Sequence, residues 1–145
     1  RGELYRPPPP LQLMDIRAKQ RAVVEALEDV KGRDILVFNT ARMPSMFERV
    51  VIASGDSNRQ VRALADRVQE RIRELGSRVY GVEGEKSGEW VLVDLGDVVV
   101  HIMHPAVREF YNLEEVWGGK TIRLINRKKP KQPRRAKAKR PRGQR

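Results

Sequence analysis

The stretch EWVLVDLGDVVVHIM, residues 89–103, decides the fold of this chain. Two runs rich in β-branched and aliphatic residues flank Leu95-Gly96. This pattern predicts a β-hairpin with a two-residue turn, in which the glycine supplies a positive φ. Because alternate side chains of a strand point to opposite faces of a sheet, the two faces of the hairpin follow from the sequence.

The two faces of the predicted hairpin differ in character. One is purely aliphatic, which predicts core. The other is mixed, and the predicted turn places Asp94 opposite Asp97, and Trp90 opposite His101. The aliphatic face carries Val91, Val93, Leu95, Val98, Val100 and Ile102, and the mixed face carries Trp90, Leu92, Asp94, Asp97, Val99, His101 and Met103.

The mixed face is open to two interpretations. Facing carboxylates destabilise a sheet unless a cation of the protein, a metal or a basic partner compensates them. Tryptophan and methionine beside acidic residues are typical of an interaction surface. The alternative is that a helix covers this face and leaves the two carboxylates solvated at its edge.

Helix and strand patterns alternate before the hairpin. Apolar residues recur at helical spacing over residues 12–30 and 57–75, and short apolar runs at residues 35–38 and 50–53 favour buried strands. A further strand is expected at residues 78–82. The strand–helix–strand order predicts a right-handed crossover and a parallel pair formed by the second and third of these strands.

After the hairpin the pattern is less regular. It predicts a short helix that begins at Pro105, a turn over residues 113–117 and an edge strand within residues 120–125. The fold class expected from the sequence is therefore α/β. A mixed β-sheet of about five strands is flanked by helices in a single domain.

Composition excludes several classes of protein. The chain has 145 residues and no cysteine, which excludes a disulfide scaffold, a zinc knuckle, an iron–sulfur site and a thiol nucleophile. No apolar run approaches the roughly 18 residues that a membrane span needs. The start lacks the pattern of a signal peptide, so we expect a cytoplasmic protein without a membrane partner.

Charge divides the chain into three parts. Residues 1–11 hold four consecutive prolines, which predict an extended arm. Residues 12–118 form the domain and carry a small excess of acidic residues, whereas residues 119–145 hold thirteen Lys and Arg and no acid. This tail has no large core to bury and is expected to be disordered when free. It either contacts phosphate backbones or serves as a solubilising extension.

Two further features carry less chemistry. The segment GDSNRQ, residues 55–60, precedes a helix and would suit an anion, but a capped helix is the favoured interpretation because Ser57 is an ordinary cap. His101 and His104 are three residues apart, which places them on opposite faces of a strand, so we expect no shared metal. No cofactor is expected.

Three segments resemble one known family: VEALEDVKGRDI at residues 24–35, SGDSNRQVRALAD at residues 54–66, and the long run at residues 82–117. They are similar to the bacterial ribosomal silencing factors, also called the Iojap-like family. The resemblance covers roughly residues 12–118. It implies a nucleotidyltransferase-like mixed sheet without an established activity.

The resemblance also implies a function. Members bind the large ribosomal subunit through large-subunit ribosomal protein number fourteen, block subunit joining and reduce translation in starvation or stationary phase. Organelle relatives act in assembly of the mitochondrial large subunit, and some members form homodimers. On the basis of this resemblance we expect a translational repressor and not an enzyme.

The family's partner-contacting region falls on the mixed face. The resemblance therefore implies an apolar anchor at Trp90, with the two aspartates meeting basic groups of the ribosomal protein. The implied partner-binding residues are Trp90, Asp94, Asp97, His101 and Met103. Ribosomal RNA contacts are a hypothesis for the tail residues Arg127, Lys128, Lys129, Arg134 and Arg135.

Two rival functions stay open at this point. One is an active nucleotidyltransferase, which would need a phosphate loop at residues 55–57 together with Asp94 and Asp97 as metal-binding carboxylates. The other is an RNA-binding or large-subunit assembly factor that acts through the basic tail.

Overall fold

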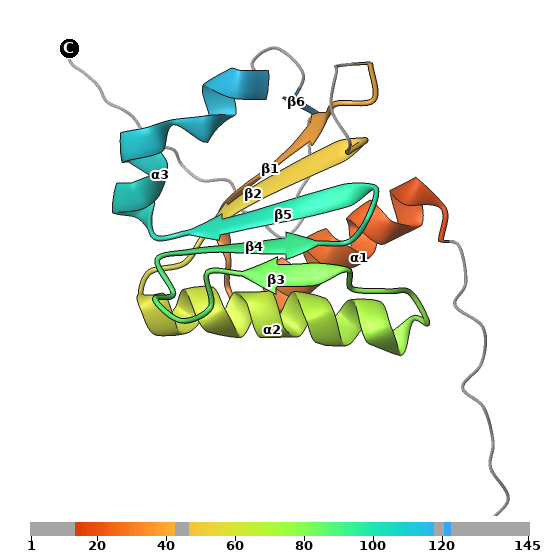
Figure 1. Ribbon diagram of the computed structural model, residues 1–145, viewed down its shortest axis with the longest axis horizontal. Helices are drawn as coiled ribbons and strands as arrows, with labels where there is room; N and C mark the ends of the chain where they lie inside the picture. Colours follow the sequence, from red (N-terminus) through yellow and green to blue (C-terminus); the bar gives the residue numbers. More distant parts are fainter. Residues whose placement is uncertain (1–13, 43–46, 118–120, 123–145) are drawn as a thin grey trace, which may run out of the picture.

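A six-stranded mixed sheet in the order β3-β4-β5-β2-β1-β6 organises the molecule, with α1 and α2 on one face and α3 on the other (Figure 1). The computed structural model describes residues 14–42, 47–117 and 121–122. The elements are α1 Ile16–Asp29, β1 Arg33–Asn39, β2 Arg49–Ser54, α2 Asn58–Glu74, β3 Gly81–Glu83, β4 Trp90–Asp94, β5 Val98–Met103, α3 Pro105–Tyr111, the 3-10 helix η1 Leu113–Trp117 and β6 Thr121–Ile122.

Helix α2 forms where the sequence predicts it. Ser57 caps its start, because the serine side chain accepts a hydrogen bond from the Gln60 N–H at 3.1 Å. The Gln60 side chain in turn accepts the Asp56 N–H at 2.6 Å. Gly76 follows the helix with φ of 79°, a conformation that favours glycine. These contacts confirm the capped-helix interpretation of residues 55–60.

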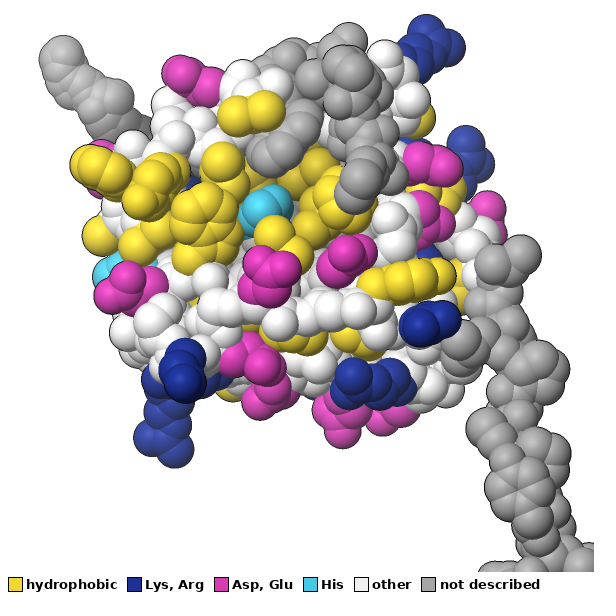
Figure 2. All heavy atoms as spheres, in the orientation of Figure 1, with side chains coloured by type: hydrophobic (Ala, Val, Ile, Leu, Met, Phe, Trp, Pro, Cys, Tyr) yellow, Lys and Arg dark blue, Asp and Glu magenta, His cyan; other side chains and the backbone are white. Residues whose placement is uncertain are grey.

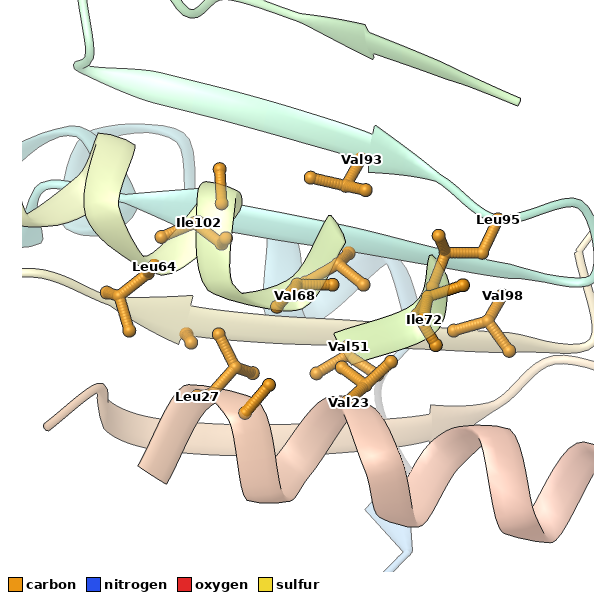
Figure 3. Close-up of a cluster of buried hydrophobic side chains, with 14 of the residues drawn as sticks. Val23, Leu27, Val51, Leu64, Val68, Ile72, Val93, Leu95, Val98 and Ile102 are labelled. Atoms are coloured by element: carbon orange, nitrogen blue, oxygen red, sulfur yellow. The ribbon is translucent and has the colours of Figure 1, made fainter. Parts of the chain in front are cut away.

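The aliphatic face of the hairpin is core, as predicted. Its side chains are fully buried against the apolar stripes of α1 and α2 (Figure 3). Burial of a valine, leucine or isoleucine contributes about 2 kcal/mol to folding, so this layer supplies much of the stability of the domain. The labelled side chains in the layer are Val23, Leu27, Val51, Leu64, Val68, Ile72, Val93, Leu95, Val98 and Ile102.

The register of the hairpin differs from the prediction by two residues. Asp94 lies opposite Val99, and the Leu95 N–H donates to the Val98 carbonyl at 2.8 Å, so the turn residues are Gly96 and Asp97. Leu95 is fully buried in the core layer and therefore belongs to the strand side of the turn. Gly96 takes φ of 95°, as predicted. A shift of two residues leaves the side chains of β4 and β5 on their predicted faces, whereas Asp97 moves into the turn.

The predicted parallel pair involves different strands. β2 pairs in parallel with β5, not with β3, and β3 pairs antiparallel with β4 at the edge of the sheet. The β4–β5 hairpin lies between the strands that the sequence analysis paired. All six residues of β5 are buried, and a strand covered on both faces is stable at the centre of a sheet.

The two ends of the chain are only partly described. The edge strand expected within residues 120–125 is present as the two-residue β6, which pairs antiparallel with β1. The predicted arm at residues 1–11 and most of the predicted tail lie outside the described residues. Within the described part, no helix is long and apolar enough to cross a membrane.

Candidate docking face

The candidate site is the face of the sheet that lies away from α1 and α2, here called the open face. On strands β3 to β5 it carries Gly81, Glu83, Trp90, Leu92, Asp94, Val99, His101 and Met103. Helix α3 and η1 cover part of it through Val107 and Leu113. Figure 2 shows hydrophobic side chains gathered around a histidine on this side of the molecule, with acidic side chains along one margin. The helical cover expected as the alternative is present over part of this face, and the interaction surface stays a prediction for the rest.

An aromatic cluster marks the border between the sheet and α3. The ring centroids of Trp90 and Tyr111 are 5.2 Å apart. The ring centroids of Tyr111 and Phe110 are 4.9 Å apart, in an edge-to-face arrangement. Phe110 is 79% exposed and Tyr111 is 55% exposed. Val116 in η1 is also exposed. Large apolar side chains in contact with one another and with solvent mark an interaction site.

The sequence analysis did not name these two aromatics of α3 as site residues. The available signal was the adjacent pair Phe110-Tyr111, both on a predicted helix too short to bury two rings on one side.

Trp90 is held in place by His101. The Trp90 indole N–H donates to His101 Nδ1 at 3.0 Å, and the two ring centroids are 5.9 Å apart. His101 is only 8% exposed, and this burial lowers its pKa from 6.5 to about 4. The imidazole is therefore uncharged at neutral pH and can accept the indole proton. The role of His101 in this structure is to orient Trp90.

Met103 lies beneath the open face. Its side chain is 0% exposed and packs with Phe38, Val50, Ile52 and Val99 in a second apolar cluster. The resemblance implied a partner contact for Met103, but a fully buried side chain offers no surface to a partner. In this structure Met103 forms the floor of the site.

Asp94 and Asp97 do not face each other, because the turn lies one residue further along than predicted. Lys19 of α1 is buried and places its Nζ 2.7 Å from Asp97 Oδ1 and 3.1 Å from the Leu95 carbonyl. Asp94 Oδ1 accepts the Gly96 N–H at 2.9 Å. Of the three compensating groups that the sequence left open, a cation of the protein is present at Asp97: Lys19 neutralises this carboxylate from the helical side. Asp94 stays on the open face.

The carboxylates needed for a nucleotidyltransferase are not assembled. In the parallel pair, Arg49 of β2 lies beside Val98 and Ser54 lies beside Met103. The loop at residues 55–57 therefore follows the end of the sheet that is opposite to the turn carrying Asp97. Within the described residues no group of three His, Cys, Asp or Glu is placed to hold a metal ion.

Helix α3 is fixed to the sheet by polar contacts. Arg108 is buried and donates to the Ser54 hydroxyl at 2.8 Å. His104 caps the helix by accepting the Ala106 N–H at 3.2 Å. These contacts hold the exposed ring of Phe110 at the border of the open face. The tail candidates Arg127, Lys128, Lys129, Arg134 and Arg135 lie outside the described residues.

Comparison with known proteins gives a consistent result. Residues 14–145 match the family model described as "Ribosomal silencing factor during starvation". The chain is 54% identical over 106 residues to a ribosomal silencing factor of Chromobacterium violaceum, covering 73% of this chain and 87% of the relative. It is 32% identical over 98 residues to the mouse "mitochondrial assembly of ribosomal large subunit protein 1", covering 66% of this chain and 43% of that protein.

The fold agrees with a solved structure. A crystal structure of a Chromobacterium violaceum protein superposes with a TM-score of 0.72 at 50% sequence identity, covering 78% of this chain and 94% of that chain.

Proposed function

Because this chain belongs to the ribosomal silencing factor family, we propose that it represses translation by docking its open face on the large ribosomal subunit. The partner is the large-subunit ribosomal protein number fourteen. The bound domain occupies volume that the small subunit needs, and so it blocks subunit joining during starvation. No covalent step is required, and the site of action is the cytoplasm.

The observation that supports this proposal best is the aromatic cluster beside an acidic margin. Phe110 and Tyr111 supply exposed apolar area, and His101 orients the ring of Trp90. Interfaces concentrate their binding energy in such rigid aromatic anchors. Asp94 adds a carboxylate next to them, which complements a basic ribosomal protein.

The predicted partner-binding residues take unequal roles in this proposal. Trp90 and Asp94 contact the partner directly. His101 positions the indole, and Met103 supports the floor. Asp97 acts through Lys19, since this ion pair fixes the turn that follows Asp94. The tail residues Arg127, Lys128, Lys129, Arg134 and Arg135 contact ribosomal RNA and add a salt-dependent component to the affinity.

Co-sedimentation with purified large subunits tests the proposal. The full chain is compared with the double variant Asp94→Arg, Phe110→Ser, which alters the open face at one half-buried and one exposed position. We expect the affinity to fall by at least about tenfold, because hot-spot residues cost 2 kcal/mol or more. Inhibition of subunit joining should fall in parallel.

A matched control separates the open face from the general effect of such changes. The double variant Asp66→Arg, Leu75→Ser alters an exposed acid of α2 and the exposed leucine at its end, on the other side of the sheet. This control should bind as the unmodified chain does. Equal binding by the two double variants would contradict the proposal and would place the contact on the helices or the tail.

A second function is suggested by the mouse relative, whose name assigns it to assembly of the large ribosomal subunit. The same face would then bind a maturing subunit. The two functions predict different states of the large ribosomal subunit in cells that lack the gene. Silencing predicts mature large subunits that join too readily in starvation, whereas assembly predicts immature large subunits during growth.

A further inference from the structure

The acidic margin of the open face holds a second carboxylate, Glu83, beside Asp94. Glu83 lies opposite Leu92 in the β3–β4 register and therefore shares the open face with Asp94. At the open-face positions of β3, β4 and β5, the described chain carries these two carboxylates and no Lys or Arg. The margin is thus an uncompensated negative edge beside an apolar centre.

The acids on the helical side differ from those of the margin. Asp29 pairs with Arg67 at 3.1 Å, and Glu25 pairs with Arg71 at 3.3 Å. Neither Glu83 nor Asp94 forms an ion pair within the described part of the chain. Arginines of α2 therefore neutralise several acids on the helical side, whereas the margin of the docking face is available to an external cation.

We propose that the basic tail of the same chain, residues 123–145, occupies this margin when no ribosome is bound. The tail carries twelve Lys and Arg and no acid. It begins after Ile122 of β6, at the edge of the sheet opposite to β3. Five strand spacings of about 4.8 Å separate the two edges, or about 24 Å. The 23 tail residues span up to about 75 Å when extended, so the tail reaches the margin easily.

Charge and covalent tethering favour the basic tail as the segment that binds the acidic margin. A tethered segment is present at an effective concentration on the order of millimolar, which favours it over a free basic peptide. The inference rests on the proposed function in one respect: the margin belongs to the face that docks on the ribosome. The tail and the basic ribosomal partner then compete for Glu83 and Asp94. On the ribosome the tail leaves Glu83 and Asp94 and binds ribosomal RNA. The two carboxylates are then free to bind the basic ribosomal protein.

Carbodiimide cross-linking of the full chain tests this inference without a ribosome. The reagent joins a lysine to a carboxylate only when the two are in contact. We expect links from the tail lysines to Glu83 and Asp94 in the monomer. They should exceed, several-fold, links to Asp66, which is exposed on α2, forms no ion pair in the described part of the chain and serves as the matched acid. The tail lysines are Lys128, Lys129, Lys131, Lys137 and Lys139.

Salt and substitution provide the controls. Raising the ionic strength from about 0.01 M to about 1 M shortens the Debye length from about 30 Å to about 3 Å, and should abolish the links to the margin. The double variant Glu83→Gln, Asp94→Asn should leave the tail linked only at the low level seen at Asp66. Equal links to the margin and to Asp66, links found only in a dimer band, or links that persist at high salt would each overturn the inference. None of these outcomes bears on ribosome docking, because no ribosome is present.

Discussion

The two faces of the sheet are built from the same strands, yet they are completed differently. On the helical face the valines and isoleucines of β4 and β5 are fully covered by α1 and α2, which are 14 and 17 residues long. The open face is covered only in part, by the seven residues of α3 and the five of η1. Two long helices seal a core, whereas one short helix supports a site. The difference assigns folding free energy to one face and recognition to the other.

The largest expected loss of stability follows from a substitution in the helical face. Val100→Asp places a carboxyl among fully buried aliphatic side chains and should cost at least about 4 kcal/mol of unfolding free energy. Leu92→Asp, on the half-buried side of the neighbouring strand, should cost about 1 kcal/mol. Urea unfolding followed by circular dichroism measures both. Similar costs would mean that the open face is as much a core as the helical face.

The next effect concerns the buried histidine beneath the open face. The pKa of His101 is about 4 in the folded protein, against 6.5 when exposed. The unfolded chain therefore binds more protons between these values, and stability falls as the pH falls from about 6.5 through 4. From pH 7 to pH 5 this group alone should cost about 2 kcal/mol.

The control is His101→Gln, which keeps an acceptor for the Trp90 indole and removes the titration. Urea unfolding at pH 7 and pH 5 compares the two proteins. A variant whose stability falls as steeply with pH as that of the unmodified protein would contradict the assignment of the loss to His101.

A smaller effect is expected at the contact that joins α1 to the hairpin turn. Lys19→Met removes the cation from Asp97, whose side chain is one-third exposed. Partial solvation of the remaining carboxylate limits the cost to about 1–2 kcal/mol. A double-mutant cycle with Asp97→Asn, measured by thermal unfolding, isolates the pair. A coupling energy near zero would show that α1 and the turn are held by packing alone.

The smallest change in stability should accompany a large change in binding. Phe110→Ala removes a ring that is 79% exposed and should shift the free energy of unfolding by less than about 0.5 kcal/mol. Its affinity for large subunits should fall by about tenfold or more. Thermal unfolding and co-sedimentation of one preparation give both values. Strong destabilisation with unchanged binding would reverse the roles assigned to the two faces.

Much of this division could be predicted from the sequence. Strict alternation assigned the side chains of β4 and β5 to their faces, because a register error of two residues does not change the parity. It misplaced Asp97, which lies in the turn and pairs with Lys19. The ends of α2 followed from Ser57 and Gly76, whose chemistry is local. Local chemistry does not contain the order of strands, so the pairing of β2 with β5 was missed.

The parts of the site that were missed have a common physical origin. The ion pair of Lys19 with Asp97 and the hydrogen bond of Arg108 with Ser54 join residues 78 and 54 positions apart. No periodicity reports such a contact. The burial of Met103 was missed for the same reason, since alternation gives the face of a side chain but not what packs over it.

The central position of β5 has a consequence for the way the chain matures. Strand β5 pairs with β4 on one side and β2 on the other, so before residues 98–103 are synthesised the two halves of the sheet have no common partner. Lys19, near the start of the domain, also has no partner until Leu95 and Asp97 have been synthesised. A nascent chain emerging from a ribosome therefore gains its docking face in one late step, when nearly all of the domain has left the exit tunnel.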